Sequence, residues 1–377
     1  MTKEQIETNH TNQRILWIDI AKAIAIILVV CGHCDNFISF SIQKFAGLFF
    51  MPLFIFISGY FFKNRIIENF NDLKNFLIKR VWPIYKYYLT YEILFYILTN
   101  IFFKIGFYSS SVMYGNKIVH PITSFSEFSL TVCKIIFLMG REPFCGAFWF
   151  LIALIFVATG YSIIVYISNK LNNKNLIHLA VLLCFCLGCI MRYDIVYNIP
   201  RFSPALTLIL FYHLGNLTHN FKDKFQFDKK YLAIGSLIGL LVLYQCGWVS
   251  MNKNIFPNPI SLILSSLCGI YFVLHISKII YNKCPVLTNV LVYIGRNTLP
   301  IIAFHLFSFK VVMLFQLYFG VIKFEQLAIL NGVNNNNLWY VFYVLIGVTV
   351  PLMINFAIQK IKIFLIKHST LHNIIKK

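Results

Sequence analysis

Charged side chains are scarce in this chain of 377 residues. Asp, Glu, Lys and Arg together make up 12%, whereas hydrophobic residues make up 59% and the mean hydropathy is +0.73. A water-soluble domain of this length does not need so much apolar side chain, so the composition argues against an ordinary soluble enzyme. Repeated apolar runs of about 20 residues instead predict an all-α, polytopic membrane protein.

Acidic residues are scarcer than basic ones, with 13 Asp and Glu against 33 Lys and Arg. A net charge of +20 could indicate a nucleic-acid partner. The basic residues fall between the apolar runs, however, where Lys and Arg mark the cytoplasmic side of a membrane protein. We therefore expect no nucleic acid as a partner.

Several motifs of soluble enzymes are missing from the sequence. It contains no Walker A loop, no GxSxG nucleophile elbow and no glycine-rich dinucleotide loop. The ten cysteines form no extracellular disulfide framework. The string from Cys31 to Cys34 matches a redox motif, but it ends an apolar run and no second ligand pair with zinc-like spacing follows. We expect neither a metal nor a redox centre.

About ten membrane spans are predicted, with the N- and C-termini both cytoplasmic (N-in and C-in), because the segments that then face the cytoplasm carry most of the basic residues. The first run follows Arg14 with no cleavage site, which predicts an uncleaved signal anchor. Residues 1–13 and 361–377 are expected to be cytoplasmic tails around one transmembrane domain, 14–360. The segment 129–140 is too short to span and is expected to be interfacial or re-entrant. The predicted spans lie near 15–34, 45–62, 82–103, 145–167, 177–191, 203–217, 231–250, 258–280, 297–320 and 337–359.

The first predicted span contains three ionisable residues, Asp19, Lys22 and His33. Charge inside a membrane helix costs a few kcal/mol, so its presence needs a reason. Asp19 and Lys22 are neighbours on a helix and can pair. Lys22 and His33 are eleven residues apart, which returns to nearly the same helix face about 16 Å further along. We predict that both face one interior chamber, with Lys22 toward the cytoplasm and His33 toward the outside.

Two other segments offer candidate binding residues. Ser58 and Gly59, in the second predicted span, either permit close helix packing or border a ligand cavity. Arg141 and Glu142 precede an aromatic segment at Trp149. They either anchor the interface or clamp an acceptor or anionic donor, because Arg forks onto phosphate or carboxylate. Three more charged residues could extend this clamp at the mouth of the cavity: Arg192, Asp194 and Arg201.

Further ionisable residues occur in or beside later spans. Arg296 precedes a span in which His305 lies two turns inside, as either a packing or a functional residue. Glu92 lies within the third predicted span and needs a partner. Candidate cations for Glu92 are Lys22, Arg296 and Lys310.

Together these segments resemble the acyltransferase-3 family, integral membrane O-acyltransferases of bacterial surface glycans. The family's first-span signature, a basic residue followed by His with an Asp nearby, is matched by Asp19, Lys22 and His33, although Arg is commoner than Lys in the family. The sequence of the second predicted span most resembles the sugar O-acetylase branch that includes fucose 4-O-acetylase-like proteins. Segments similar to the family's other landmarks are 51–59, 149–151 and 295–305.

The resemblance implies a multi-pass protein of the bacterial cytoplasmic (inner) membrane, in contact with membrane lipid. It would transfer acetyl from cytoplasmic acetyl-CoA to a sugar hydroxyl of an O-antigen, capsule, exopolysaccharide or lipid-linked sugar, with no permanently bound cofactor. A longer acyl group such as succinyl stays open. His33 would act as general base or accept the acyl group, and Lys22, ordered by Asp19, would hold the donor or stabilise negative charge. Candidate substrate-binding residues are Ser58, Arg141, Glu142, Trp149, Arg296 and His305.

Two other functions compete with acyl transfer. An exporter or flippase for a polysaccharide or lipid-linked sugar also suits intramembrane charges and a Pro-Gly-broken helix, although the two halves of the chain do not resemble each other. A structural membrane subunit would leave Asp19, Lys22 and His33 unexplained.

Overall fold

The computed structural model describes residues 14–34, 41–62, 67–115, 117–140, 142–191, 202–221, 227–333 and 337–375. Within these residues, the only strands are β1 (Met113–Tyr114) and β2 (Lys117–Ile118), which form an antiparallel pair. Everything else that is regular is helical, so the predicted all-α class is confirmed. The helices are α2 (Leu16–His33), α3 (Ile42–Gly47), α4 (Phe50–Tyr60), α5 (Phe70–Phe76), η2 (Leu77–Val81), α6 (Trp82–Ile97), α7 (Thr99–Lys104), α8 (Phe125–Ile136), η3 (Pro143–Phe148), α9 (Trp149–Lys170), α10 (Asn175–Ile190), α11 (Phe202–Asn220), α12 (Lys230–Gln245), α13 (Pro259–Lys283), α14 (Pro285–Arg296), α15 (Thr298–Tyr318), η5 (Phe324–Ala328) and α16 (Asn337–Ile375).

Six helical segments of the described chain are long and apolar enough to cross a membrane, so this is an all-α membrane protein. The other four predicted spans fall on α6 with α7, on α10, on α11 and on α12. Three of these helices, α6, α10 and α12, have 16 residues each, or about 24 Å, against a hydrocarbon core of about 30 Å. The six candidate spans are Leu16–His33, Ile42–Tyr60, Pro143–Lys170, Pro259–Lys283, Thr298–Tyr318 and Leu338–Leu365.

Two helices differ from the sequence expectations. Helix α14, twelve residues long, occupies a stretch for which no element was expected, and it begins with Pro285 at a position that tolerates proline. Helix α16 runs through to Ile375, so most of the expected tail 361–377 continues the last helix. At 39 residues α16 is about 58 Å long, well beyond the thickness of a hydrocarbon core.

Polar residues fix the starts of several helices. The Ser124 hydroxyl accepts a hydrogen bond from the Glu127 backbone N–H at the start of α8. Asn258 caps α13 in the same way, just before Pro259, with its side-chain oxygen 2.8 Å from the Ser261 nitrogen. Each cap satisfies a backbone donor that has no partner within its own helix.

Glycines let the central helices approach closely. A Cβ added at Gly59 of α4 would lie 1.9 Å from the Tyr212 carbonyl oxygen of α11. A Cβ added at Gly215 of α11 would lie 2.0 Å from the Phe56 carbonyl oxygen of α4. Of the two roles considered for Ser58 and Gly59, helix packing is therefore the one that Gly59 performs.

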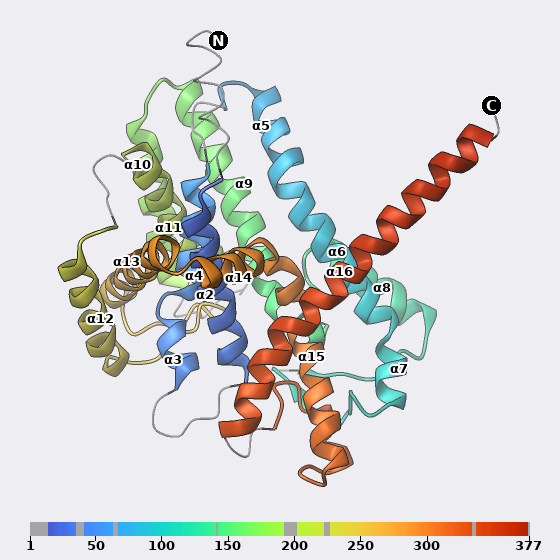
Figure 1. The fold of residues 1–377 in the computed structure, drawn as a ribbon. Coiled ribbons are helices and arrows are strands. Elements are labelled where there is room, and N and C mark those ends of the chain that lie inside the picture. Colours follow the sequence, from blue (N-terminus) through green and yellow to red (C-terminus); the bar gives the residue numbers. More distant parts are fainter. Residues whose placement is uncertain are drawn as a thin grey trace.

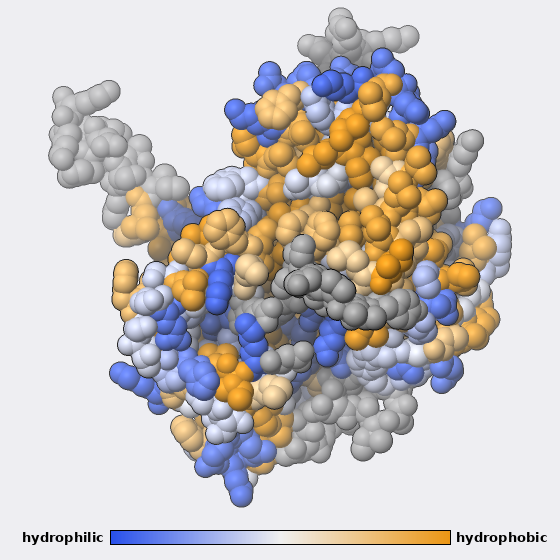
Figure 2. Space-filling model, turned by 180° about the vertical axis from the view of Figure 1, so that it is seen from behind, coloured by the Kyte–Doolittle hydropathy of each residue, from blue (hydrophilic) through white to orange (hydrophobic). Residues whose placement is uncertain are grey.

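Helices α2 and α4 lie near the centre, with α12 and α13 on one side and α6, α7 and α8 on the other (Figure 1). Helix α5 and the connection between α9 and α10 lie at the same end of the molecule, and α3 lies at the opposite end. Figure 2 shows hydrophobic residues gathered over the upper part of one face, with hydrophilic residues along the top rim and over much of the lower part. Exposed apolar residues on α10 and α12 suit contact with lipid: Leu179, Leu182, Leu183, Leu187, Ile234, Ile238, Leu241 and Val242.

Candidate active site

The start of α2 holds a carboxylate surrounded by cations. Asp19 Oδ1 lies 2.6 Å from Lys22 Nζ, and Asp19 Oδ2 lies 2.8 Å from Arg14 Nε and 3.5 Å from Arg296 Nε. The Asp19 side chain is only 4% exposed, whereas those of Arg14 and Arg296 are 56% and 43% exposed. Three cations around one carboxylate leave two positive charges unbalanced, on side chains that solvent or a ligand can reach. We call these four residues the Asp19 cluster.

The ends of two helices bring this cluster together. Asp19 lies in the first turn of α2, where the helix dipole favours an anion, and Arg296 lies in the last turn of α14, where it favours a cation. The helices meet because residue 295 is glycine: an added Cβ would lie 1.8 Å from the Asp19 carbonyl oxygen. The contact between Arg296 and Asp19 thus depends on Gly295.

The opposite end of α2 carries a pair of histidines. The rings of His33, in the last turn of α2, and His305, in α15, have centroids 5.0 Å apart. His305 Nδ1 lies 2.8 Å from the Ile301 carbonyl oxygen, which can only accept, so Nδ1 carries the proton and donates. His305 Nε2 is buried and has no hydrogen-bond partner within the described parts of the chain. A buried acceptor nitrogen without a partner is costly, which marks this pair as a functional candidate.

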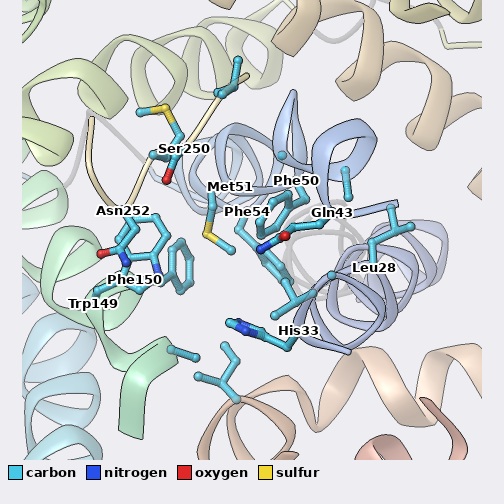
Figure 3. Close-up of a pocket in the computed structure, with 18 of the residues that line it drawn as sticks. Leu28, His33, Gln43, Phe50, Met51, Phe54, Trp149, Phe150, Ser250 and Asn252 are labelled. Carbon is cyan, nitrogen blue, oxygen red and sulfur yellow. The ribbon is translucent and has the colours of Figure 1, made fainter. Parts of the chain in front are cut away.

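Two cavities meet at His33. The smaller, of about 150 Å³, is mostly apolar, and the larger, of about 690 Å³, is more polar. His33, Gln43, Trp149 and Asn252 line both cavities, so these four side chains form their common wall. Figure 3 shows the smaller cavity, with His33, Gln43, Asn252 and Trp149 arranged around an open centre.

Two buried carboxylates, Glu92 and Glu142, line the larger cavity. The Glu142 backbone N–H donates to Glu92 Oε2, with 3.3 Å between nitrogen and oxygen. The hydroxyl groups of Tyr108 and Thr99 donate to the Glu142 carboxylate. Burial raises the pKa of Glu142 to about 7, against the opposing effect of these two hydrogen bonds. Glu142 therefore titrates near neutral pH at the wall of the cavity.

The predicted site residues divide into groups. Asp19, Lys22 and Arg296 come together in the Asp19 cluster, as described. His33, Glu142 and Trp149 line the larger cavity. His305 lies beside His33 but lines neither cavity. Ser58, on α4, also lines neither cavity. Arg141, Arg192, Asp194 and Arg201 lie outside the described residues.

The structure also locates the three cations considered for Glu92. Lys22 and Arg296 contact Asp19 instead. Lys310 Nζ donates to the carbonyl oxygens of Leu327 and Ile329, at 2.6 and 2.7 Å. Neither of the two cavities is lined by Lys22, so they do not join Lys22 and His33 in one chamber.

Three residues of these sites were not predicted from the sequence. Arg14 directly precedes the first apolar run, and its position five residues before Asp19 was the available signal. Gln43 lies in the short helix α3, and Asn252 lies in the turn between α12 and α13. Neither a six-residue helix nor a turn is long enough to show a periodic pattern, so only the tertiary fold reveals that Gln43 and Asn252 line the same two cavities as His33.

The described residues contain no group of three or more His, Cys, Asp or Glu side chains placed to hold a metal ion. The Cys34 thiol donates to the carbonyl oxygens of Val30 and Cys31, at 3.3 and 3.6 Å. This is the contact that a buried cysteine at the end of a helix ordinarily makes.

Residues 15–356 match the family model described as an acyltransferase domain of the acyltransferase-3 type, which covers nearly the whole chain. No curated protein and no solved structure matches the chain. The matched range contains the Asp19 residue, both histidines and the walls of both cavities.

Proposed function

Since the chain belongs to the acyltransferase-3 family, we propose that it transfers an acetyl group from acetyl-CoA to a sugar hydroxyl of a cell-surface or exported glycan in the bacterial inner membrane. The observation that carries this proposal is the arrangement along α2. A cationic cluster lies at its start, and a histidine that borders two cavities lies at its end.

The Asp19 cluster suits the phosphates of CoA. Arg14 and Arg296 are partly exposed and present guanidinium groups, which bind phosphate oxygens in a forked geometry. Asp19 holds these cations in place without neutralising all of them. Lys22 is about 16 Å along the helix from His33, so in this proposal it holds the donor and does not touch the reacting carbonyl.

We place the Asp19 cluster on the cytoplasmic side of a ten-span, N-in and C-in topology. The excess of basic residues between the predicted spans on that side supports the orientation. The location of α5 and the α9–α10 connection at one end of the molecule is consistent with it (Figure 1). Acetyl-CoA would then reach its site from the cytoplasm, and the extended pantetheine arm would carry the thioester toward His33.

His33 performs the transfer in this proposal. As general base it takes the proton of the sugar hydroxyl, the oxygen attacks the thioester carbonyl, and the C–S bond breaks. The departing CoA thiolate receives the proton from His33. In the two-step alternative, a His33 nitrogen first displaces the CoA thiolate, which breaks the C–S bond. The sugar oxygen then displaces His33, and the hydroxyl proton passes by way of the imidazole to the thiolate. His305, fixed by its Nδ1 bond to Ile301, packs against the His33 ring in this proposal.

The larger cavity suits the acceptor. Its volume of about 690 Å³ lies within the range of small-molecule sites, about 300–1,000 Å³. Glu142, Asn252 and Trp149 offer a carboxylate, an amide and an aromatic face, which are the groups that bind sugar hydroxyls and C–H edges. His33 stands on the same wall and reaches a hydroxyl bound there.

The experiment compares surface glycans from a deletion strain that carries wild type, His33→Ala or His120→Ala, the last at an exposed histidine that itself lines neither cavity. We expect mass spectrometry to find the acetyl groups restored by wild type and His120→Ala but not by His33→Ala, with normal glycan amount throughout. Normal acetylation by His33→Ala would contradict the mechanism. Loss of the glycan itself in the deletion strain would favour the exporter.

A further inference from the structure

The smaller cavity beside His33 differs in chemistry from the larger one. It is lined by no Asp, Glu, Lys or Arg among the described residues. Besides His33, its polar side chains are those of Gln43, Ser250 and Asn252, and most of the remaining wall is aliphatic or aromatic. Met51 and Phe54 of α4 supply part of this wall, and the Phe54 ring packs 5.5 Å from that of Phe150.

We propose that this smaller cavity is the acyl pocket, and that it selects a short, uncharged acyl group. The inference rests on the proposed acyl transfer and names the donor class that the same site accepts. His33 lies on the cavity wall, so an acyl carbon chain seated inside has its carbonyl group next to the imidazole. The sugar hydroxyl would approach from the larger cavity, across the shared wall.

The volume sets the chain length. An apolar cavity of about 150 Å³ holds a molecule of the size of benzene, or about six carbon atoms. Acetyl, propionyl and butyryl groups fit this volume, whereas an octanoyl chain does not. A well-packed wall does not expand without strain, so the longer chain is excluded.

The lining sets the charge. A succinyl group would place its carboxylate inside the pocket. Among the described residues that line the pocket, no Lys or Arg can pair with it. Burying an unpaired carboxylate is far more costly than burying a methyl group. The pocket therefore discriminates against succinyl even though its carbon chain is short enough.

Two substitutions change the pocket in opposite directions. Phe54→Ala removes a ring from the wall and lengthens the pocket. Ala147→Leu, in η3, adds three carbon atoms at a buried position of the same wall. Phe185→Ala is the matched control, because Phe185 is equally buried in α10 and lines neither cavity.

The test uses membranes of the deletion strain, whose unacylated glycan is the acceptor, with the full-length variant and acetyl-, butyryl-, octanoyl- or succinyl-CoA. Mass spectrometry of the glycan identifies the acyl group that was transferred. We expect wild type and Phe185→Ala to transfer acetyl and butyryl but neither octanoyl nor succinyl. Phe54→Ala should raise the octanoyl-to-acetyl ratio by about tenfold or more, and Ala147→Leu should lower the butyryl-to-acetyl ratio.

The outcomes separate this inference from the function it rests on. Absence of transfer from every acyl-CoA by wild type would overturn both. Acetyl transfer with ratios unchanged in Phe54→Ala and Ala147→Leu would overturn the acyl pocket alone, as would succinyl transfer by wild type as fast as acetyl. If Phe54→Ala does not fold, Met51→Ala tests the same wall with a smaller side chain.

Discussion

The two ends of α2 hold polar groups of opposite kinds. At its start, Asp19 is buried among cations whose side chains remain partly exposed, so the site is charged and accessible to solvent. At its end, His33 and His305 lie among aromatic residues, and the polar groups shared by the two cavities, Gln43 and Asn252, are uncharged. The first environment suits binding of a polyanion, and the second suits proton transfer and acyl transfer. In the proposed function, one helix therefore separates donor binding from chemistry.

The largest effect is expected at the histidine end. His33→Ala should lower the acetyl transfer rate by about 10²–10⁴-fold, because the general base or nucleophile is lost. The KM for acetyl-CoA should change little, because the Asp19 cluster is intact. Initial rates with labelled acetyl-CoA in membranes measure both quantities. A large rise in KM without a fall in rate would place His33 in donor binding and remove the distinction between the two ends.

Glu142 gives the larger cavity a pH dependence that the Asp19 cluster does not share. Folded Glu142 has a pKa raised from 4.5 to about 7, so between these values the folded state binds more protons than the unfolded state. Its contribution to stability is therefore present at low pH and is lost as the pH rises toward 7, by about 3 kcal/mol in all.

Thermal unfolding in detergent at pH 5 and pH 8 measures this effect. Measured relative to wild type, the unfolding temperature of Glu142→Gln should rise between pH 5 and pH 8, whereas that of Glu127→Gln, on the surface of α8, should stay parallel to wild type. An unchanged difference in Glu142→Gln would show that other groups titrate instead.

Gly295 tests whether the cluster depends on the approach of α14 to α2. Gly295→Ala would place a Cβ against the Asp19 carbonyl oxygen, so the helices must separate, at a cost of about 1–3 kcal/mol. We expect a lower unfolding temperature and a higher KM for acetyl-CoA. Gly235→Ala is the control, because its added Cβ has no neighbour within 4 Å and should not destabilise α12. Equal behaviour of the two variants would contradict the close approach.

Arg296 should give the smallest effect. Arg296→Gln should raise the KM for acetyl-CoA by about tenfold, the value of one charge-assisted hydrogen bond, with little change in the maximal rate. Arg296→Lys should recover part of the loss, because lysine supplies the charge but not the fork. Lys360→Gln, on α16, removes a positive charge elsewhere and should leave KM unchanged. A fall in the maximal rate of Arg296→Gln would place Arg296 in the chemical step.

The sequence predicted contacts within one helix better than contacts between helices. The pairing of Asp19 with Lys22 follows from their spacing, and the structure contains it. Arg296 was recognised as a candidate, but its contact with Asp19 requires α14, a short helix that apolar run length does not reveal. Periodicity also placed Lys22 and His33 on one face, yet it could not show that the two cavities described here are lined by His33 and not by Lys22.

The span count shows the same limit. Each of the ten predicted spans falls on a helical region, but only six helical segments of the described chain are long and apolar enough to cross a membrane. The runs on α6 with α7, on α10, on α11 and on α12 contain helices too short or too polar to be separated from buried helices by composition alone. On α11, the buried His213 and Asn216 bond to Tyr161, a polar network that only the packed structure explains.

The sidedness of donor use tests the separation of the two ends most directly. Labelled acetyl-CoA would be added to sealed inside-out and right-side-out vesicles of the strain, and transfer to glycan would be measured in each. We expect transfer only in inside-out vesicles, where the Asp19 cluster faces the added donor. Equal transfer in right-side-out vesicles would contradict it.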